Sequence, residues 1–574
     1  MAWRIALMMM FAGSATASEV LVEAESFSDK GGWVLDQQFV HQMGSPYLLA
    51  HGMGKPVADA VTTVIFPQTG KYRVWVRSKN WVPGEWKAPG RFHVKVGGRL
   101  LPVEFGTETG WTWQDGGIVD VAGKTTGVRL IDLTGFEGRC DALFFTTDFD
   151  KVPSDTIERL KPETVSAGQF DLVVVGGGIA GCGAALAADR QGLTVALIHD
   201  RPLLGGNASS EVRVHTLGIK GADDTFLDGI DSAHWKNGSA EAVKDTEKRH
   251  RTLDASGVKQ FLSWQAFGVE MHGQRIKSVD ARHIESGKAM RFEAKVFIDC
   301  TGDGWIGYWA GADFRYGRES RNEFDEGWDK HGELWSPETP DNRVMGSSVL
   351  WNSHRLDQPT DFPDVPWAME VAKDHASING EWQWELSHND LHQIDDAEEI
   401  RDHMFRAIYG SFSNAKKNPE NANVALKWVA HIAGKRESRR LMGDYIFTMK
   451  DVTENRIFPD TVVTEKRAID VHYQEKLKGE PVDFLSEALF YRTGEYYIPF
   501  RCLYSRNIEN LMMAGRCFSC SHVGLGGPRV MRTTGQMGIA TGFAASLCIE
   551  FDTNPRGVYK NHLTELRRLC GYED

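Results

Sequence analysis

The stretch that decides the fold is FDLVVVGGGIAGCGAALAADRQGLTVALIHDRPLLGGNAS, residues 170–209. It opens with the apolar run DLVVV, which is typical of a parallel strand buried on both faces. Gly176, Gly178 and Gly181 follow in the spacing G-x-G-x-x-G, before a helical segment and a second apolar run, TVALI. Glycines at these positions permit a tight turn, close approach of the backbone to a pyrophosphate, and close packing of helix on strand. The stretch therefore predicts a dinucleotide-binding unit with the phosphates at the helix N-terminus.

The residues after the second strand indicate which dinucleotide binds, because NAD and FAD both use this unit. Directly after the strand come Gly205, Gly206 and Asn207. In flavoproteins of the glutathione-reductase-like type such a loop carries the chain beside the flavin, and NAD dehydrogenases rarely have it. The strand end, which usually gives one carboxylate to the adenosine ribose, here holds His199, Asp200 and Arg201. We expect FAD, with neutral His199 or Asp200 reaching the ribose and Arg201 among the cofactor contacts.

A second segment, residues 294–312 (AKVFIDCTGDGWIGYWAGA), supports FAD. Its apolar strand is followed by Thr301, Gly302 and Asp303, in the manner of the ATG-type segment of these flavoproteins. We expect the strand to turn beside the nucleotide at these three residues.

A third segment, residues 508–550, again gives a strand, a glycine turn, a loop and a helix. We predict cofactor contacts from Gly515 and Arg516 in the turn and from the small residues Gly535 and Gly538 in the helix. The N-terminus of this helix is expected to face the pyrimidine edge of the isoalloxazine, where its dipole stabilises negative charge on the reduced flavin.

From about Phe170 to the C-terminus the chain resembles the bacterial FAD-dependent oxidoreductase family, which is often found beside polysaccharide-degrading enzymes. The motifs RPLLGGNASSEVRVH, RESRRLMGDY, AIDVHY and IENLMMAGRCFSCSHVGLGGPRVMRTTGQMG carry the resemblance. It covers about 400 residues and implies FAD as the cofactor more firmly than it implies a substrate.

The glycine motif begins late because a separate region of short strands precedes it. KYRVWVRS and RFHVKVGG alternate apolar and polar residues, which predicts strands with one buried face. The opening VEAESF resembles the galactose-binding-like jelly rolls of carbohydrate enzymes. Residues 41–57, HQMGSPYLLAHGMGKPV, form a long insertion that we expect to reach over a neighbouring active site.

The predicted fold class is α/β, a Rossmann-type FAD-binding domain with an inserted substrate-side portion, preceded by an all-β sandwich domain. The predicted boundaries are a signal peptide at 1–18, the β-sandwich at 19–150, a linker at 151–168 and the oxidoreductase domain at 169–574. Within that domain the substrate-side portion comprises mainly residues 216–293 and 313–507, and the cofactor segments are 170–215, 294–312 and 508–550.

The first residues, MAWRIALMMMFAGSATAS, have one early positive charge, a short apolar run and a small-x-small end, which are typical of a cleaved signal peptide. The alternatives are a short disordered tail or a lipid-facing anchor. The apolar run is too short for a stable membrane span. We therefore expect an exported protein.

The net charge of −13, from 78 acidic and 65 basic residues, argues against a nucleic-acid partner. Eight cysteines are too few for a disulfide-held scaffold, and the pair in CFSC, residues 517–520, reads either as a redox pair or as two packed thiols. No zinc spacing, P-loop or Ser-His-Asp arrangement occurs, so no metal is expected.

Oxidation of an alcohol requires a base for the hydroxyl proton beside the flavin, and histidine suits that role. His522 lies in the loop between the last flavin strand and the last helix, where many alcohol-oxidising flavoproteins keep the base. His472 and Asp470 lie two residues apart in RAIDVHY, on one side of an expected strand. His522 is the first candidate base and His472 the second; a structural role is the alternative for both.

Six further polar residues are candidates for substrate contact. Glu211, Arg213 and His215 alternate along an expected extended segment, so period two would place them on one face beside the flavin. The other three candidates are the arginines Arg440, Arg529 and Arg532. For all six the alternative is an ordinary ion pair or an exposed strand face.

The sequence thus predicts an exported flavoenzyme that oxidises a secondary hydroxyl of a carbohydrate or glycan by hydride transfer to flavin N5. The alternatives are a flavin dehydrogenase or reductase of a non-sugar small molecule, and a carbohydrate-binding protein with a vestigial flavin site. The sugar, the electron acceptor, covalent flavin attachment and the oligomeric state are left open.

Overall fold

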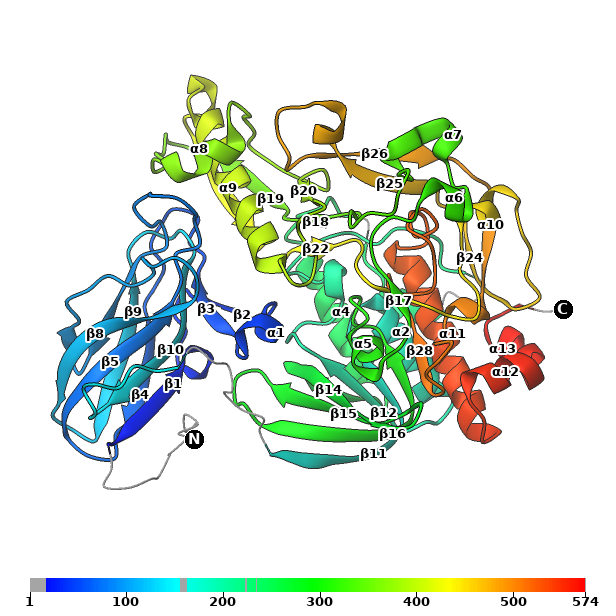
Figure 1. Ribbon diagram of the computed structural model, residues 1–574, viewed down its shortest axis with the longest axis horizontal. Coiled ribbons are helices and arrows are strands. Elements are labelled where there is room, and N and C mark those ends of the chain that lie inside the picture. The colour runs from blue at the N-terminus through cyan, green and yellow to red at the C-terminus, as the bar shows by residue number, and fades with distance from the viewer. Residues whose placement is uncertain (1–16, 155–162, 222–224, 234, 573–574) are drawn as a thin grey trace.

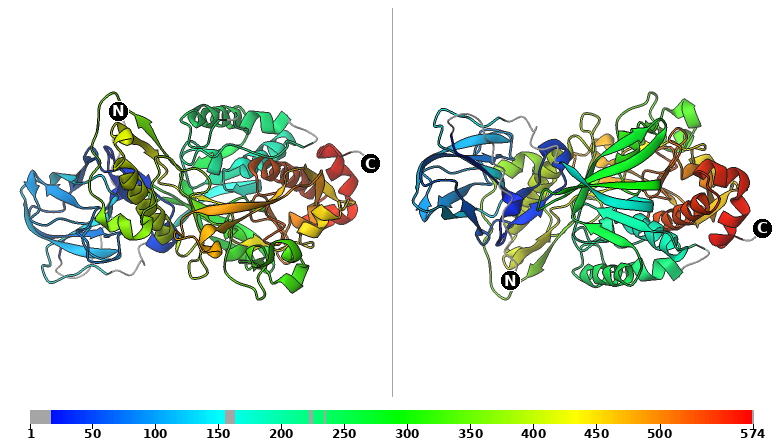
Figure 2. Two further views of the ribbon diagram at one scale, coloured as in Figure 1. Left: turned by 90° about the horizontal axis from the view of Figure 1, so that it is seen from above. Right: turned by 90° about the horizontal axis from the view of Figure 1, so that it is seen from below.

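A computed structural model describes residues 17–154, 163–221, 225–233 and 235–572. The predicted signal peptide lies outside the described residues except for its last two. Figure 1 shows an N-terminal region made mostly of strands, in blue, beside a larger region of mixed helices and strands. The C-terminal helices α12 (Pro555–Asn561) and α13 (Leu563–Leu569) lie at the end farthest from the N-terminal sheets (Figure 2).

The N-terminal region consists of two antiparallel sheets with a shared hydrophobic cluster. The first has the order β2-β3-β10-β5-β8 with β1 also on β10, and its strands are β1 (Glu19–Glu23), β2 (Val34–Asp36), β3 (Tyr47–Ala50), β5 (Gly70–Ser78), β8 (Thr112–Val121) and β10 (Gly138–Thr146). The second has the order β4-β9-β6-β7, with β4 (Ala60–Ile65), β6 (Phe92–Val96), β7 (Arg99–Leu100) and β9 (Thr125–Asp132). The two-residue period predicted for RFHVKVGG is observed in β6, where buried and partly exposed residues alternate, whereas β5, from KYRVWVRS, is buried along most of its length.

A seven-stranded mixed sheet forms the centre of the larger region. Its order is β13-β12-β11-β16-β15-β14, with β28 on β16, and its strands are β11 (Thr164–Val175), β12 (Val195–His199), β13 (Lys259–Leu262), β14 (Trp264–His272), β15 (Arg275–His283), β16 (Ala289–Asp299) and β28 (Leu511–Met513). The three predicted cofactor segments supply β11, β12, β16 and β28, which pair in parallel. Their carboxyl ends therefore meet at one edge. β11 begins at Thr164, inside the predicted linker.

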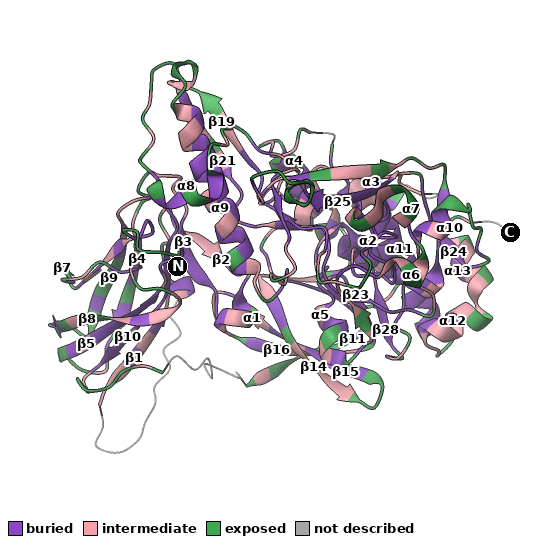
Figure 3. Ribbon diagram, turned by 45° about the horizontal axis from the view of Figure 1, so that its top comes forward, coloured by how far each residue is buried: buried purple, intermediate pink, exposed green. Residues whose placement is uncertain are grey.

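Two helices, α2 (Ile179–Arg190) and α11 (Met531–Glu550), pack closely beside the sheet and are almost wholly buried (Figure 3). Small residues permit this contact, because a Cβ at Gly538 or Gly542 would overlap a backbone oxygen of α2. A Cβ at Gly535 would likewise crowd the side chains of Ile179, in α2, and of the neighbouring Leu227. Gly535 and Gly538 thus serve helix packing, which corrects their prediction as cofactor contacts.

The rest of the larger region consists of further helices and of short strands. Its helices are α3 (Thr225–Ile230), α4 (Ala242–Asp254), α5 (Trp305–Ala310), α6 (Arg321–Phe324), α7 (Trp328–His331), α8 (Pro366–Ala372), α9 (Ala397–Lys416) and α10 (Met449–Thr453). Its strands pair as β17 (Phe314–Arg315) with β23 (Arg440–Leu441), β18 (Ser347–Ser348) with β20 (Glu385–Leu386) and β22 (Gly434–Lys435), β19 (Trp351–Arg355) with β21 (Val424–Val429), β24 (Thr461–Glu465) with β27 (Tyr496–Pro499), and β25 (Ile469–Gln474) with β26 (Ser486–Tyr491).

The N-terminal region is docked on the larger region through α9, as Figure 1 shows. Arg139 of β10 is fully buried and contacts Glu398 and Asp402 of α9 at 2.6 and 2.9 Å. Arg401 of the same helix pairs with Asp36 of β2. Removing one partner of a buried ion pair typically costs about 3–5 kcal/mol, so these contacts fix how the two regions sit together.

Apolar packing reinforces the same interface. Trp81 and Phe136 of the N-terminal region belong to one cluster with Trp367 of α8 and Tyr409 of α9. Trp81 is 3% exposed and donates its Nε1–H to Phe136 O, so this tryptophan packs the interface and does not present its ring to a ligand.

The eight cysteines all fall within the described residues, where each is a buried free thiol. Of the two readings of residues 517–520, the structure shows packed thiols. None of the helices in the described ranges has the length and apolar character to cross a membrane.

Candidate active site

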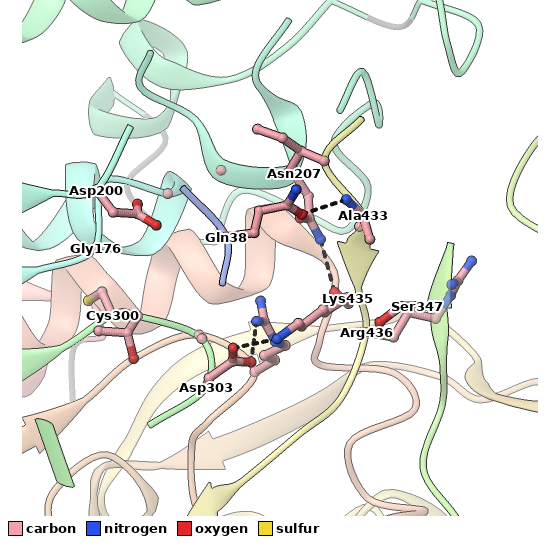
Figure 4. A pocket seen from close by; sticks show the side chains of 18 of the residues that line it. Gln38, Gly176, Asp200, Asn207, Cys300, Asp303, Ser347, Ala433, Lys435 and Arg436 are labelled. Atoms are coloured by element: carbon pink, nitrogen blue, oxygen red, sulfur yellow. Dashed lines mark hydrogen bonds and ion pairs between the residues drawn. The ribbon is translucent and has the colours of Figure 1, made fainter. Parts of the chain in front are cut away.

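A cavity of about 1000 Å³ opens where the three cofactor segments meet. Figure 4 shows part of its lining, which comes from the turns at Gly176, Cys300 and Asp303, from Asp200 and Asn207, and from the strand that carries Lys435 and Arg436. The volume lies at the upper end of the range for small-molecule and cofactor sites. The structure thus brings the three distant segments together at one cavity, as the sequence predicts.

The glycine turn after β11 has the geometry expected of a pyrophosphate cradle. Gly176 has a φ of +107°, and a Cβ there would overlap Cys300 O. A Cβ at Gly181 would overlap Gly176 O, so only glycine lets the helix start this close to the strand. A Cβ at Gly178 would have only Gly206 Cα within reach, at 4.0 Å, so the Gly178 backbone borders open space. A phosphate group fits that space at the N-terminus of α2.

The double-glycine loop lies against this turn. Gly205 donates its N–H to Gly177 O at 2.8 Å, and its φ of +118° suits glycine. Gly206 and Asn207 also line the cavity, and Asn207 Nδ2 donates to Lys435 O at 3.0 Å. The loop therefore runs beside the turn, as predicted for a flavin-binding chain.

His199 has a different role from the predicted ribose contact. Its Nδ1 accepts from Gly177 N at 3.0 Å and its Nε2 donates to Leu203 O at 3.1 Å, so both ring nitrogens hold the turn and the loop together. Asp200 lines the cavity with 44% of its side chain exposed, and Arg201 lines it as well. Of the two ribose candidates, Asp200 is the one with an exposed carboxylate at the cavity, although its Oδ1 also lies 3.1 Å from His199 Nδ1.

The second and third segments meet at Asp303. Its carboxylate contacts Lys435 Nζ and Arg516 Nη2, each at 2.8 Å, and accepts from Ser438 Oγ at 2.7 Å. Burial would raise the pKa of Asp303, but Lys435 and Arg516 lower it well below its usual range. Two cations on one carboxylate leave a net positive charge at the cavity wall. Thr301, Gly302 and Gly515 border the cavity beside this group.

The N-terminus of α11 forms the next part of the wall, with Val530, Met531 and Thr534 lining the cavity. The predicted approach of this helix N-terminus to the cofactor site is therefore observed. The helix dipole makes this end favourable for negative charge.

The N-terminal region closes the cavity on the opposite side. Residues 38–42 and Gly44, which include most of α1 (Val40–Met43), line it. His41 stacks on Trp305 with ring centroids 3.8 Å apart, and Gln38 Oε1 accepts from Ala433 N at 3.0 Å. The start of the 41–57 insertion thus reaches the active-site cavity, and Gln38 just before it does so too.

His472 lies on the cavity wall between two carboxylates. Nδ1 is 2.7 Å from Glu385 Oε2, and Nε2 is 3.1 Å from Asp470 Oδ1. Burial would raise the pKa of Glu385, but Arg436 and His472 lower it to about 2, and Arg529 and His472 lower the pKa of Asp470 against the effect of burial. Both partners are therefore ionised. Asp470 and His472 lie two residues apart on β25 and share a face, as predicted.

His522 lies outside the cavity lining, which corrects its prediction as the base. It is 2% exposed, its Nδ1 contacts Glu437 Oε2 at 2.8 Å, and its Nε2 is buried with no hydrogen-bond partner among the described residues. It belongs to a buried polar cluster with Glu319, Glu437 and Arg440. The loop before α11 turns this side chain away from the cavity.

Of the six predicted substrate residues, His215 and Arg529 line the cavity. The extended segment predicted for three of them is wrong, because the chain turns at Ser210 and Arg213 has a φ of +61°.

The other four candidates make contacts elsewhere. Glu211 pairs with Arg201, and Arg213 stacks on Trp428 at 4.1 Å. Arg440 is fully buried against Glu319, and Arg532 pairs with Asp231. These ion pairs and the ring contact satisfy the four side chains away from the cavity.

Several lining residues were not predicted. The Trp382 ring packs against His472 with ring centroids 5.1 Å apart, and Phe490 lies opposite Asp470 in the β25–β26 pair; these two side chains are 39% and 52% exposed. Arg436 and Arg467 reach Glu385 and Asp470, the two carboxylates beside His472. The heptapeptide RAIDVHY includes Arg467, so that arginine had a local signal. Trp382 and Phe490 come from chain distant in sequence and carry no motif.

A family model described as FAD dependent oxidoreductase matches residues 171–569. A search of curated proteins gives no match.

Several solved structures match parts of the chain. A geranylgeranyl bacteriochlorophyll reductase-like protein from Thermoplasma acidophilum has 14% identity over 70% of this chain and 82% of its own, with a TM-score of 0.30. The myxobacterial chondrochloren halogenase, described as a variant of FAD-dependent halogenases, has 13% identity over 70% and 79%, with a TM-score of 0.29. A family 35 carbohydrate binding module from Clostridium thermocellum has 20% identity over 22% and 97%, with a TM-score of 0.19.

Proposed function

The chain belongs to the FAD-dependent oxidoreductase family and is an enzyme with FAD as its cofactor, and on this premise we propose that it oxidises a secondary hydroxyl of a carbohydrate or glycan to a ketone. One observation carries the proposal: His472, between two ionised carboxylates, lies on the cavity wall beside the partly exposed rings of Trp382 and Phe490. Aromatic faces with a polar neighbour suit the C–H face and hydroxyls of a sugar ring.

The residues around the glycine turn fit FAD, in a Rossmann-type arrangement. The open space at Gly178 and the N-terminus of α2 suit the pyrophosphate, and Lys435 and Arg516 supply more positive charge than Asp303 neutralises. Asp200 is assigned to the ribose. When bound, FAD supplies the acceptor for the hydride that leaves the carbinol carbon.

His472 handles the hydroxyl proton in this proposal. Glu385 accepts from Nδ1–H at 2.7 Å and orients the ring, whereas Nε2 lies 3.1 Å from Asp470 Oδ1 without a hydrogen bond and is the nitrogen assigned to take up the proton. The substrate hydroxyl passes its proton to Nε2. The imidazolium that forms then lies between Glu385 and Asp470, whose negative charges stabilise it. Positioned proton transfer of this kind contributes roughly 10²–10⁴-fold to a rate.

The two-sheet N-terminal region is proposed as a β-sandwich of the galactose-binding type, spanning residues 19–150, attached to an oxidoreductase domain at 169–574. Its docking on α9 and its wall along the cavity support a role in the active site. Export after cleavage near residue 18 is proposed from the sequence pattern alone.

The proposal is tested by anaerobic reduction of the bound flavin. Purified FAD-loaded protein is mixed with a panel of sugars, uronic acids and oligosaccharides, with simple secondary alcohols of similar size as controls. We expect a saccharide to bleach the visible flavin absorbance and to yield the keto sugar. Bleaching by the alcohols alone, or by nothing in the panel, would remove the carbohydrate assignment.

A second candidate is reduction of a small non-sugar molecule. The observation that favours it is that both nitrogens of His472 lie beside carboxylates, at 2.7 and 3.1 Å, an arrangement that also suits a group that donates a proton to a substrate. A reductase would keep its flavin oxidised with every alcohol tested, and its chemically reduced form would lose electrons to an added carbonyl compound or activated alkene.

A further inference from the structure

Three arginines contact the two carboxylates beside His472. We call Arg436, Arg467 and Arg529 the arginine cluster; all three line the cavity. Arg467 and Arg529 contact Asp470, at 2.8 and 3.4 Å, and Arg436 contacts Glu385 at 3.2 Å. Three guanidiniums share two carboxylates, so the cluster keeps a net positive charge. In a chain of net charge −13, this local excess of positive charge is a distinct feature.

The cluster is not saturated with partners. Arg529 Nε and Arg467 Nε are buried and have no hydrogen-bond partner among the described residues. The Arg529 side chain is only 11% exposed, and burial lowers its pKa to about 10 despite the nearby Asp470. A buried donor without a partner is costly, by about 1–3 kcal/mol, more when the group is charged. The Nη1 atoms of Arg467 and Arg529 make no hydrogen bond among the described residues, and both arginines line the cavity, so an anionic ligand there would pair with these donors.

Arg436 differs from the other two in its contacts. Its guanidinium also donates to Ser348 Oγ at 2.8 Å and to Trp382 O at 2.7 Å. It therefore holds the backbone that carries the Trp382 ring, while Arg467 and Arg529 have donors left for a ligand.

We propose that Arg467 and Arg529 bind a carboxylate of the substrate, so that the sugar oxidised at His472 is an acidic one, a uronic acid or a glycan that carries uronic acids. This inference rests on the proposed function, because it places the sugar between Trp382, Phe490 and His472. Guanidiniums bind carboxylates through short charge-assisted hydrogen bonds, which are about twice as strong as neutral ones. The matching neutral sugar would leave the Arg529 and Arg467 donors unpaired.

The flavin is the competing occupant of the same donors. The N-terminus of α11, at Val530 and Met531, already provides a wall for the pyrimidine edge. Arg529 precedes this wall, and its partner Asp470 lies opposite Phe490 in the β25–β26 pair, at the exposed side. This arrangement favours a ligand between the flavin and solvent, and the experiment below separates the two occupants.

The experiment uses the FAD-loaded protein under anaerobic conditions with two matched pairs of probes, D-glucuronate against D-glucose and D-galacturonate against D-galactose. Each pair differs only in the group at C6. The concentration that half-saturates the change in the flavin spectrum is measured for the parent, R529Q, R467Q and R532Q. R532Q is the control, because Arg532 pairs with Asp231 away from the cavity.

We expect a half-saturating concentration at least about tenfold lower for one acidic sugar than for its neutral partner, in line with the strength of charge-assisted hydrogen bonds. R529Q and R467Q should lose this preference, and R532Q should keep it. Equal half-saturation for acidic and neutral sugars that both bleach the flavin would overturn the inference while the proposed function stands. An acidic preference in spectral shifts without any bleaching would leave the subsite standing and overturn the proposed function.

Two variants, R529Q and R467Q, are made so that the test remains valid if one of them fails to fold. If both retain the fold, shown by an unchanged circular dichroism spectrum, but lose FAD, then the arginines bind the flavin and the carboxylate subsite is wrong.

Discussion

The two ends of the cavity differ in what builds them. At the cofactor end the wall is formed mainly by backbone. The turns at Gly176, Gly205 and Gly302 have positive φ angles and leave no room for side chains. At the substrate end the wall is formed mainly by side chains. These are His472, the arginine cluster, Trp382 and Phe490, which come from separate loops and strands. Backbone geometry restricts the sequence to recognisable motifs, whereas a side-chain constellation can be assembled from many sequences.

The largest expected effect is at the cofactor end. Gly181→Ala places a Cβ on Gly176 O, a backbone atom that cannot move without opening the turn. We expect a loss of stability of at least about 3 kcal/mol and purification without FAD. The ratio of flavin to protein absorbance and a denaturant titration measure both. Gly268→Ala is the matched control, because a Cβ there meets nothing within 4 Å. Normal FAD content in Gly181→Ala would refute the backbone account.

The second-largest expected effect distinguishes the substrate end of the cavity from the cofactor end. His472→Asn should slow anaerobic flavin reduction by about 10²–10⁴-fold and leave FAD content unchanged, because the imidazole acts on the substrate proton. His522→Asn, in the buried cluster, should reduce flavin at nearly the parent rate once folded. Stopped-flow absorbance gives both rates. If His522→Asn were the slower variant, the base would be His522, as the sequence predicts.

The buried cluster near His522 should affect stability instead of catalysis. Glu326 accepts from Ser521 Oγ at 2.7 Å, and burial raises its pKa to about 7. Because the folded-state pKa of Glu326 lies above the unfolded value, the folded state holds the proton more tightly. The stability that the protonated carboxyl contributes is fully present below about pH 4.5 and is lost as the pH rises through 7.

The unfolding free energy of the parent should therefore fall by about 2–3 kcal/mol between pH 4.5 and pH 7, and Glu326→Gln should not show this fall. Urea unfolding of parent and variant across that range measures the difference, and Glu338→Gln, at an exposed carboxylate, serves as the control. Parallel pH curves for parent and Glu326→Gln would contradict the assignment.

The smallest effect concerns the wall from the N-terminal region. His41→Ala removes the ring stacked on Trp305 and the contact with Gln265 at 3.2 Å. A loss of about 1 kcal/mol, or roughly fivefold in FAD affinity, is expected from one aromatic contact. Titration of the apoprotein with FAD by fluorescence quenching measures it, with His93→Ala in the same region as the control. Equal affinities would show that this wall encloses the cofactor without binding it.

The sequence predicts most of the cofactor end and little of the substrate end. The spacing of Gly176, Gly178 and Gly181 reports backbone geometry directly, and the later turns follow strands that must be parallel neighbours. The face shared by Asp470 and His472 also follows from strand period. These features are local, so one stretch of sequence contains them.

The remaining features depend on contacts between distant segments. The position of His522 before α11 says which loop it occupies, but its contact with Glu437 decides which way it turns. His199 occupies the ribose position of the motif, yet the Gly177 and Leu203 backbone groups take both its nitrogens. Gly535 and Gly538 read as cofactor contacts because small residues serve close helix packing and close ligand approach alike.

The central claim is that one cavity holds FAD by its backbone turns and presents the reactive end of the flavin to His472. The crystal structure of the FAD-loaded protein tests it most directly. The account predicts the pyrophosphate at Gly178, the isoalloxazine beside the N-terminus of α11, and room for a sugar ring between the isoalloxazine and His472. An isoalloxazine that fills the space in front of His472, or one that lies away from the α11 N-terminus, would contradict it.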